Sequence, residues 1–350
     1  MPAAAPRNVH HAIQTRIDRF DDLLPIAFHS LWGHNPAQFV QNRMIGQRVI
    51  DSPDYYFSPS TSRTLGFWSF NIAQPVQDTA LFTLLDDVTA ELASRLMAMK
   101  PKDKPHIGFT VNLNILKHTI SPSASLFYFE SRPTLTTDRK VVIECPLFDA
   151  HTGSLLLVAR ATFVFVFAPV PGKAEATAGN SAQASADTVN PVSLLPSLDA
   201  TDSGPLSNAD LDQLSQVMSF LPHGTALHRA GLQSLTNRRL VSVFDFSPDL
   251  SGPPIYVHGG LLGTVLYNAS EMLLAKVFAA DTASAVASTR DINYLKGFPL
   301  ACKSVVVDAV VESIDTESGN AVVFAKLMLG PTTHTTLKTT FELPRTPSRL

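Results

Sequence analysis

The chain has 350 residues, 45% of them hydrophobic, and a formal net charge of −3 at pH 7. A balance this close to neutral argues against the basic surface that nucleic-acid binding requires. The length predicts two domains or one double domain, with enough apolar residues for a sizeable core.

Residues 1–66 are predicted to form an N-terminal leader, with a helical pattern over 11–32 followed by polar turns. Residues 1–17 contain Arg7 and Arg16 but no acid, which is faintly similar to a mitochondrial presequence. No secretory signal or membrane span is apparent. We therefore expect the mitochondrial matrix or the cytoplasm, and not secretion.

Residues 67–168 are predicted to be the first of two similar domains. A short strand at 67–72 precedes a helix at 78–99, in which leucines recur at helical spacing. Four strand-like runs follow, at 107–116, 125–131, 140–147 and 155–167.

Residues 169–206 are predicted to be a disordered linker, because they contain no Phe, Tyr or Trp and are rich in Ala, Ser, Pro and Thr. Ser207 and Asp210 then form the pattern of a capping box, with Asp in place of Glu. It should open a helix that continues to about Phe220.

Residues 207–350 are predicted to be the second domain, and they repeat the order of the first. A strand at 239–246 and a helix at 260–279 precede strands at 286–295, 303–313, 321–329 and 335–341. Thr83 and Thr264 lie 181 residues apart, and Leu113 and Ile292 lie 179 apart. A nearly constant offset indicates an internal duplication, although generic strand patterning is the alternative.

The second helix opens with His258-Gly259-Gly260 and is apolar nearly all round, so we expect it to be buried. Glycine lets a ligand approach the backbone closely, and the first amides of a helix have no partner within it. A carbonyl or oxyanion placed there would be stabilised. The simpler alternative is that the glycines only make a tight turn from strand to helix.

His-Gly-Gly, a long buried helix and then the strand at 288–296, with Thr289, Ile292, Tyr294, Leu295 and Lys296, resemble the hotdog-fold acyl-CoA thioesterases. The resemblance covers roughly residues 238–343, and the phenylacetate-pathway type is the most similar. It implies an α+β fold of two tandem hotdog domains, each a long helix wrapped by an antiparallel sheet. The two would form an intramolecular pseudo-dimer that hides the sheet edges.

In the family, a glycine amide at the helix start faces an acidic residue from the other subunit, nine positions after that subunit's motif histidine. Here Tyr267 stands nine residues after His258, so the second copy lacks the acid. The first copy lacks the glycines, with Gln77-Asp78-Thr79 in their place, but has Asp86 and then Asp87. The resemblance therefore implies one composite site, in which Gly259 and Gly260 polarise a thioester and Asp86 attacks it or activates water.

Further roles follow from the same resemblance. Thr110, which matches Thr289, would orient a water near Asp86, and His258 would fix the turn beside the substrate rather than transfer a proton. Lys296 could bind a phosphate of coenzyme A. For each residue a structural role is the alternative: solvated helix acids for Asp86 and Asp87, a plain strand residue for Thr110, and a rim or structural role for Asn293, Tyr294 and Lys296.

Other chemistries find little support. Glu271 could be a substitute acid, but an ion pair at the helix end is the stronger expectation. Cys145 and Cys302 lack metal-ligand spacing and should be buried thiols. No Gly-x-Ser-x-Gly, nucleotide loop or zinc spacing occurs, so neither a metal nor a cofactor is expected.

Two functions therefore remain. The first is hydrolysis of an acyl-CoA or another acyl thioester at the composite site. The second is a catalytically degenerate hotdog protein that binds or supports a larger assembly, which the leader, the linker and the eroded motifs favour. The partners expected are the acyl thioester and, for the second function, other proteins or a second copy of the chain.

Overall fold

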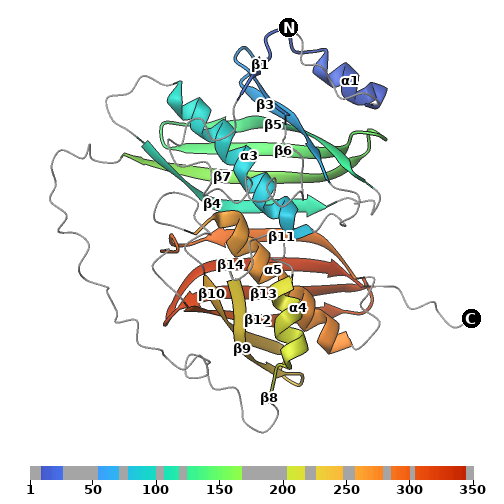
Figure 1. Ribbon diagram of the computed structural model, residues 1–350, viewed down its shortest axis with the longest axis vertical. Coiled ribbons are helices and arrows are strands. Elements are labelled where there is room, and N and C mark those ends of the chain that lie inside the picture. The colour runs from blue at the N-terminus through green and yellow to red at the C-terminus, as the bar shows by residue number, and fades with distance from the viewer. Residues whose placement is uncertain are drawn as a thin grey trace, which may run out of the picture.

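The computed structural model describes residues 9–26, 54–70, 78–99, 106–117, 124–167, 203–216, 226–246, 257–278, 285–299 and 304–343. Within these ranges the strands form one antiparallel sheet of 14 strands, in the order β1-β2-β3-β5-β6-β7-β4-β11-β14-β13-β12-β10-β9-β8 (Figure 1). The predicted combination of antiparallel sheet and helices is confirmed.

The first half of the molecule, residues 9–167, supplies the strands on one side of this order. Its elements are α1 (His11–Ile17), β1 (Leu24–Pro25), β2 (Asp54–Ser58), β3 (Arg63–Ser69), α3 (Asp78–Ala98), β4 (His106–Lys117), β5 (Leu126–Thr136), β6 (Lys140–Asp149) and β7 (Leu155–Phe167).

The second half, residues 203–343, supplies the other side. Its elements are β8 (Ser203–Pro205), α4 (Asn208–Gln216), β9 (Ala226–Ser234), β10 (Arg239–Phe246), α5 (Gly259–Phe278), β11 (Val286–Tyr294), β12 (Ser304–Asp315), β13 (Asn320–Leu329) and β14 (Thr332–Glu342).

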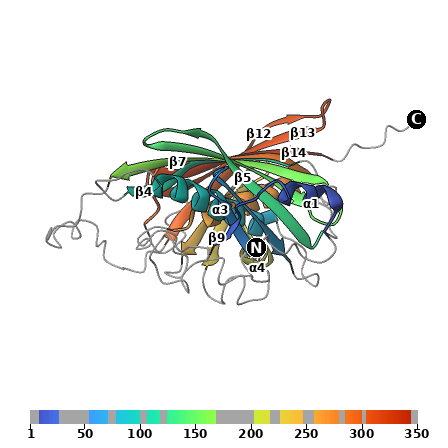
Figure 2. The same cartoon turned by 90° about the horizontal axis from the view of Figure 1, so that it is seen from above.

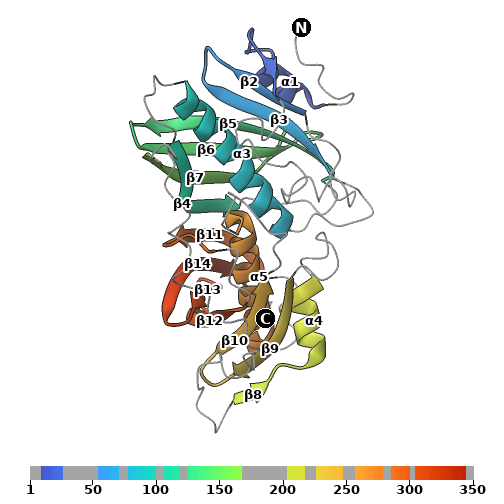
Figure 3. The ribbon, with the colours of Figure 1, turned by 60° about the vertical axis from the view of Figure 1, so that its left-hand side comes forward.

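The two long helices, α3 and α5, lie on the same face of the sheet and contact each other (Figures 2 and 3). Their apolar side chains join those of the strands in one continuous hydrophobic core. Leu84, Leu85 and Leu92 of α3 are fully buried, as their helical spacing predicts. By length and composition alone α5 could cross a membrane, and 72% of its most apolar stretch is buried inside the protein.

The halves join where β4 pairs with β11. Leu113 lies opposite Ile292, Asn112 opposite Asn293 and Asn114 opposite Asp291. Leu113 and Ile292 are equivalent positions of the two halves, because they lie 179 residues apart. The pairing of β4 with β11 is therefore symmetric about the Leu113–Ile292 pair. The Asn112 side chain donates to Asp291 Oδ1 at 2.8 Å and to the Ile292 carbonyl at 3.0 Å, so polar side-chain contacts reinforce the backbone ladder.

β2 and β3 form a hairpin that crosses residue 66, the predicted end of the leader. α1 buries Ile13 and Ile17 in a second cluster on the first half. The domain boundary itself stays a prediction. Residues 59–62 form the turn of this hairpin, as the polar turn residues there predict, and Ser62 adopts a positive φ of 54°. The expected helix over 11–32 is shorter than predicted, because α1 ends at Ile17 and residues 18–26 are not helical. Residues 27–53, which include the end of that expected helix, lie outside the described residues.

Most of the predicted linker also lies outside the described residues, at 168–202. Its last residues are ordered, because β8 pairs with β9, and the boundary at 206 stays a prediction. The capping box is confirmed: the Ser207 amide donates to Asp210 Oδ2 at 3.0 Å, and the Asp210 amide donates to Ser207 Oγ at 3.2 Å. Asp210 also forms an ion pair with Lys276 at 2.8 Å, which attaches α4 to α5.

Candidate active site

A cavity of about 410 Å³ lies at the junction of the halves, beside the start of α5 and the middle of α3. This volume is within the range of small-molecule sites. Its wall is largely apolar and comes from both halves: Ala90, Phe109, Val111, Phe163, Val164, Leu262 and Phe298. Its polar side chains are Asp86, Asp87, Ser94, Thr110, His258, Tyr294 and Lys296.

Asp86 projects from the middle of α3 and is only 5% exposed. Its Oδ1 accepts the Thr110 hydroxyl at 2.9 Å, and its Oδ2 accepts the Gly260 amide at 3.0 Å. Burial raises the pKa of Asp86, and the charge of Asp87 adds to this; His258, Thr110 and Gly260 offset only part of the rise. The structure thus brings Asp86, Thr110 and Gly260 together, and it rules out the alternative that Asp86 and Asp87 are solvated.

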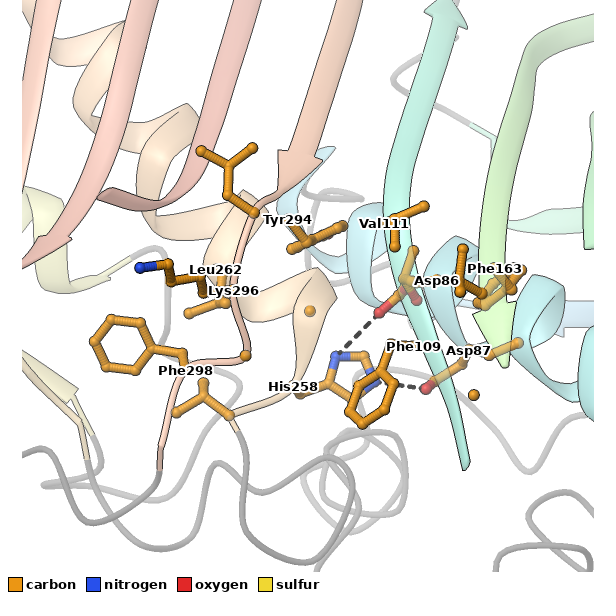
Figure 4. A pocket seen from close by; sticks show the side chains of 18 of the residues that line it. Asp86, Asp87, Phe109, Val111, Phe163, His258, Leu262, Tyr294, Lys296 and Phe298 are labelled. Atoms are coloured by element: carbon orange, nitrogen blue, oxygen red, sulfur yellow. Dashed lines mark hydrogen bonds and ion pairs between the residues drawn. The ribbon is translucent and has the colours of Figure 1, made fainter. Parts of the chain in front are cut away.

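His258 lies between the carboxylates of Asp86 and Asp87 (Figure 4). Its Nε2 is 2.7 Å from Asp87 Oδ1, and its Nδ1 is 3.7 Å from Asp86 Oδ2. Burial alone would lower the pKa of His258, but the hydrogen-bonded charge of Asp87 and the charge of Asp86 outweigh it and raise that pKa to about 9. The imidazole is therefore protonated at neutral pH.

The two glycines at the start of α5 are required by close contacts. A Cβ on Gly260 would lie 2.5 Å from Cα of Thr83, so the backbones of α3 and α5 could not pack as they do. A Cβ on Gly259 would lie 2.8 Å from Asp86 Oδ2 and 3.3 Å from the Tyr294 ring. Gly259 therefore keeps the space between these two groups open.

Tyr294 and Lys296 come from the end of β11 and the turn after it. Lys296 lines the cavity but is exposed, as a residue at the rim would be. The Tyr294 hydroxyl is buried and has no hydrogen-bond partner among the described residues. Burial and the charge of Asp86 raise the pKa of Tyr294 well above its usual value, so this phenol keeps its proton.

The place that corresponds to Asp86 in the second half is filled by Tyr267. Its hydroxyl donates to Glu271 at 2.6 Å and accepts from Arg290 at 3.1 Å. The Arg290 guanidinium lies over the Tyr267 ring, 4.4 Å from its centre, and over the Phe82 ring. Glu271 thus contacts a tyrosine in a packed aromatic cluster, and neither Glu271 nor Tyr267 lines the cavity.

Two groups at the cavity were not predicted to act there. Asp87 appeared in the sequence only as the neighbour of Asp86, and Tyr294 only as a structural or rim residue. The offset of 171 residues between Asp87 and His258 carries no pattern that a sequence could reveal. Among the described residues, no three His, Cys, Asp or Glu side chains are grouped so that they could hold a metal ion.

No protein-family model matches the sequence, and no curated protein matches it. Solved structures do. A tesB protein of Mycobacterium avium subsp. paratuberculosis has a TM-score of 0.51 at 11% identity, over 87% of this chain and 99% of that one. This chain has the hotdog fold.

Two further structures are similar at lower scores. They are an acyl-CoA thioesterase II of Mycobacterium marinum (TM-score 0.48, 11% identity, 87% and 98% of the two chains) and a 12:0-ACP thioesterase of Umbellularia californica (TM-score 0.48, 9% identity, 81% and 94%). The expected hotdog fold is confirmed. The closer likeness to the phenylacetate-pathway type stays a prediction.

Proposed function

We propose that the chain hydrolyses an acyl thioester, such as an acyl-CoA, at one composite site between its halves. The observation that carries the proposal is the contact between the Asp86 carboxylate of α3 and the Gly260 amide of α5. A buried carboxylate beside the amides of a helix start is the pair of groups that thioester hydrolysis requires.

The same residues supply the steps of the reaction. Gly259 is the first residue of α5, so its amide has no acceptor within the helix and is available to polarise the thioester carbonyl. Asp86, held by Thr110 and Gly260, attacks the carbonyl carbon or takes a proton from the attacking water. The apolar cavity wall accommodates the acyl chain, and Lys296 at the rim binds a phosphate of the carrier.

We also propose that the fold is a tandem double hotdog that acts as an intramolecular pseudo-dimer. The symmetric register of β4 and β11 about the Leu113–Ile292 pair supports this. So does the division of the site, since α3 supplies the acids and the start of α5 supplies the amides. The equivalent second site is closed by Tyr267 and Arg290. The compartment, matrix or cytoplasm, stays a prediction.

One observation favours the second candidate, a catalytically inactive binding or structural subunit. The Gly260 amide already donates to Asp86, so this amide is not available to a substrate while the contact lasts. If the contact is permanent, Asp86, His258 and Asp87 only tie the halves together.

Acyl-CoA hydrolysis by the purified protein, across short and long acyl chains, distinguishes the two. We expect Asp86→Asn to lower the rate on the order of 10²-fold or more, the scale of general-base catalysis, because the substitution is nearly isosteric but removes the base. Asp212→Asn, on the exposed side of α4, is the control and should leave the rate unchanged. Equal rates in wild type and Asp86→Asn would reject the composite site, and inactivity of the wild type would favour the inactive subunit.

A further inference from the structure

His258 differs from the other groups at the cavity because both ring nitrogens face polar partners. Nε2 contacts Asp87, and Nδ1 lies 3.7 Å from Asp86 Oδ2 and 3.1 Å from the Gly260 nitrogen. The side chain is 5% exposed and lines the cavity. At 3.7 Å a group placed this way can exchange a proton with Asp86 through one intervening water, while Asp87 holds it on the other side.

We propose that His258 is the general acid that protonates the sulfur of the leaving thiol, and that Asp87 is the positioning residue that holds it for this step. The inference rests on the proposed thioester hydrolysis, but it assigns a chemical step to a residue whose sequence context suggested only a structural role.

The surroundings of His258 keep a proton on the ring. Asp86 and Asp87 face it from α3, and both are buried, so their charges act through little water. From β11 and the turn after it come Tyr294, which stays neutral, and Lys296, which is exposed at the rim. The negative charges of Asp86 and Asp87 therefore dominate the electrostatic surroundings of His258. While Nδ1 carries its proton, the acceptor of the Gly260 amide is Asp86 Oδ2, at 3.0 Å.

Asp86, His258 and the attacking water supply and take up every proton that the reaction moves. In the water route, Asp86 takes a proton from water as the water oxygen bonds to the carbonyl carbon. The carbon–sulfur bond then breaks, and sulfur takes the Nδ1 proton of His258. Asp86 passes its proton to Nδ1, and both groups return to their starting states. One thioester and one water have become one acid and one thiol.

The contacts of Asp87 fit a role in holding His258. Its Oδ1 lies 2.7 Å from Nε2, while its Oδ2 is buried without a hydrogen-bond partner among the described residues. After sulfur takes the Nδ1 proton, the Gly260 amide at 3.1 Å can donate to Nδ1, so the ring keeps partners in both protonation states.

The test compares leaving groups. An alkyl thiol such as that of coenzyme A has a pKa near that of cysteine, about 8.5, and its departure benefits from protonation. An aryl thiol is much more acidic and leaves as the thiolate. Hydrolysis of an acyl-CoA and of the aryl thioester with the same acyl group is measured for wild type, His258→Gln, Asp87→Asn and Asp86→Asn, with thermal melts to confirm folding.

We expect His258→Gln to lower kcat/KM for the acyl-CoA on the order of 10²-fold but to change aryl thioester hydrolysis far less. Asp86→Asn should lower both equally. Asp87→Asn retains the imidazole, and it should move the alkaline limb of the pH–rate profile to lower pH because burial then dominates at His258.

Three results would overturn the inference: an equal loss on both substrates in His258→Gln, no loss on either, or an unmoved alkaline limb in folded Asp87→Asn. If any one of these results occurs while wild type is active and Asp86→Asn is not, the proposed hydrolysis stands and only the role of His258 fails. A wild type inactive on both substrates overturns the two together.

Discussion

His258 makes the stability of the protein depend on pH. Its pKa is raised to about 9 in the folded state from an ordinary value of 6.5. Stability from the bound proton is therefore fully present below about pH 6.5 and is lost as the pH rises through 9. The loss should be on the order of 3 kcal/mol, because each pKa unit corresponds to about 1.4 kcal/mol. Thermal melts from pH 6.5 to 9.5 should show a falling Tm in wild type and a flatter profile in His258→Gln.

A steep Tm profile that persists unchanged in His258→Gln would contradict this assignment. Asp86 acts in the same direction, since its raised pKa also means that the folded state holds a proton more tightly than the unfolded chain. Asp86→Asn should therefore also make the fall of Tm with rising pH shallower.

His228 has the opposite effect on the pH dependence of stability, because its folded-state pKa is lowered rather than raised. It is buried between β9 and β10, where its Nδ1 lies 3.0 Å from Ser242 Oγ, and burial lowers its pKa to about 3. A lowered histidine pKa contributes stability above pH 6.5, and this is lost as the pH falls towards 3 because the unfolded chain binds the proton. Urea unfolding between pH 7 and 4.5 should show a falling midpoint, and the fall should be shallower in His228→Gln. A parallel fall in both proteins would assign the acid sensitivity to other groups.

At the scale of elements, the packing of α3 against α5 depends on Gly260. Alanine is favoured over glycine within helices by up to about 1 kcal/mol, but here its Cβ would meet the Thr83 backbone, which cannot rotate away. We expect Gly260→Ala to destabilise the protein by about 1–3 kcal/mol and to impair hydrolysis by displacing Asp86 from the helix start. Denaturant unfolding measures the first effect, and acyl-CoA hydrolysis measures the second.

Gly204 in β8 supplies the matched control. A Cβ built there meets nothing within 4 Å, so Gly204→Ala should change stability by less than about 0.5 kcal/mol and leave hydrolysis unaffected. If both variants unfold at the same denaturant concentration as wild type, the close approach of the two helices does not limit stability.

The elements also show what a sequence can predict. The long helices and β7 were placed within one or two residues, because leucine spacing and a long apolar run are strong local signals. β9 was missed, since His228, Arg229, Gly231 and Gln233 interrupt any alternation of apolar residues. β2 was missed because the polar residues at its two ends, Asp54 and Ser58, favoured turns. Asp86 could be found only by aligning the two halves. Asp87 gains its partner His258, and Tyr294 its place at the cavity, from tertiary packing, which carries no local signal.

At the scale of the whole molecule, the site exists only where the halves meet. α3 and β4 supply Asp86, Asp87 and Thr110, and the start of α5 supplies the imidazole and the amides. The β4–β11 ladder and the packing of α3 on α5 hold these groups together without requiring the chain between residues 168 and 202. Covalent continuity through that segment should therefore be dispensable.

We expect a protease site inserted near residue 185 to give, after cleavage, two fragments that co-elute in size-exclusion chromatography under native conditions. They should keep most of the hydrolytic activity, while either fragment expressed alone should have none, because each carries half of the site. Ile292→Arg should prevent co-elution, since this buried side chain lies at the centre of the junction and an unpaired charge there is costly. Cleaved wild-type fragments that separate, or a single fragment that hydrolyses acyl-CoA alone, would contradict a site shared between the halves.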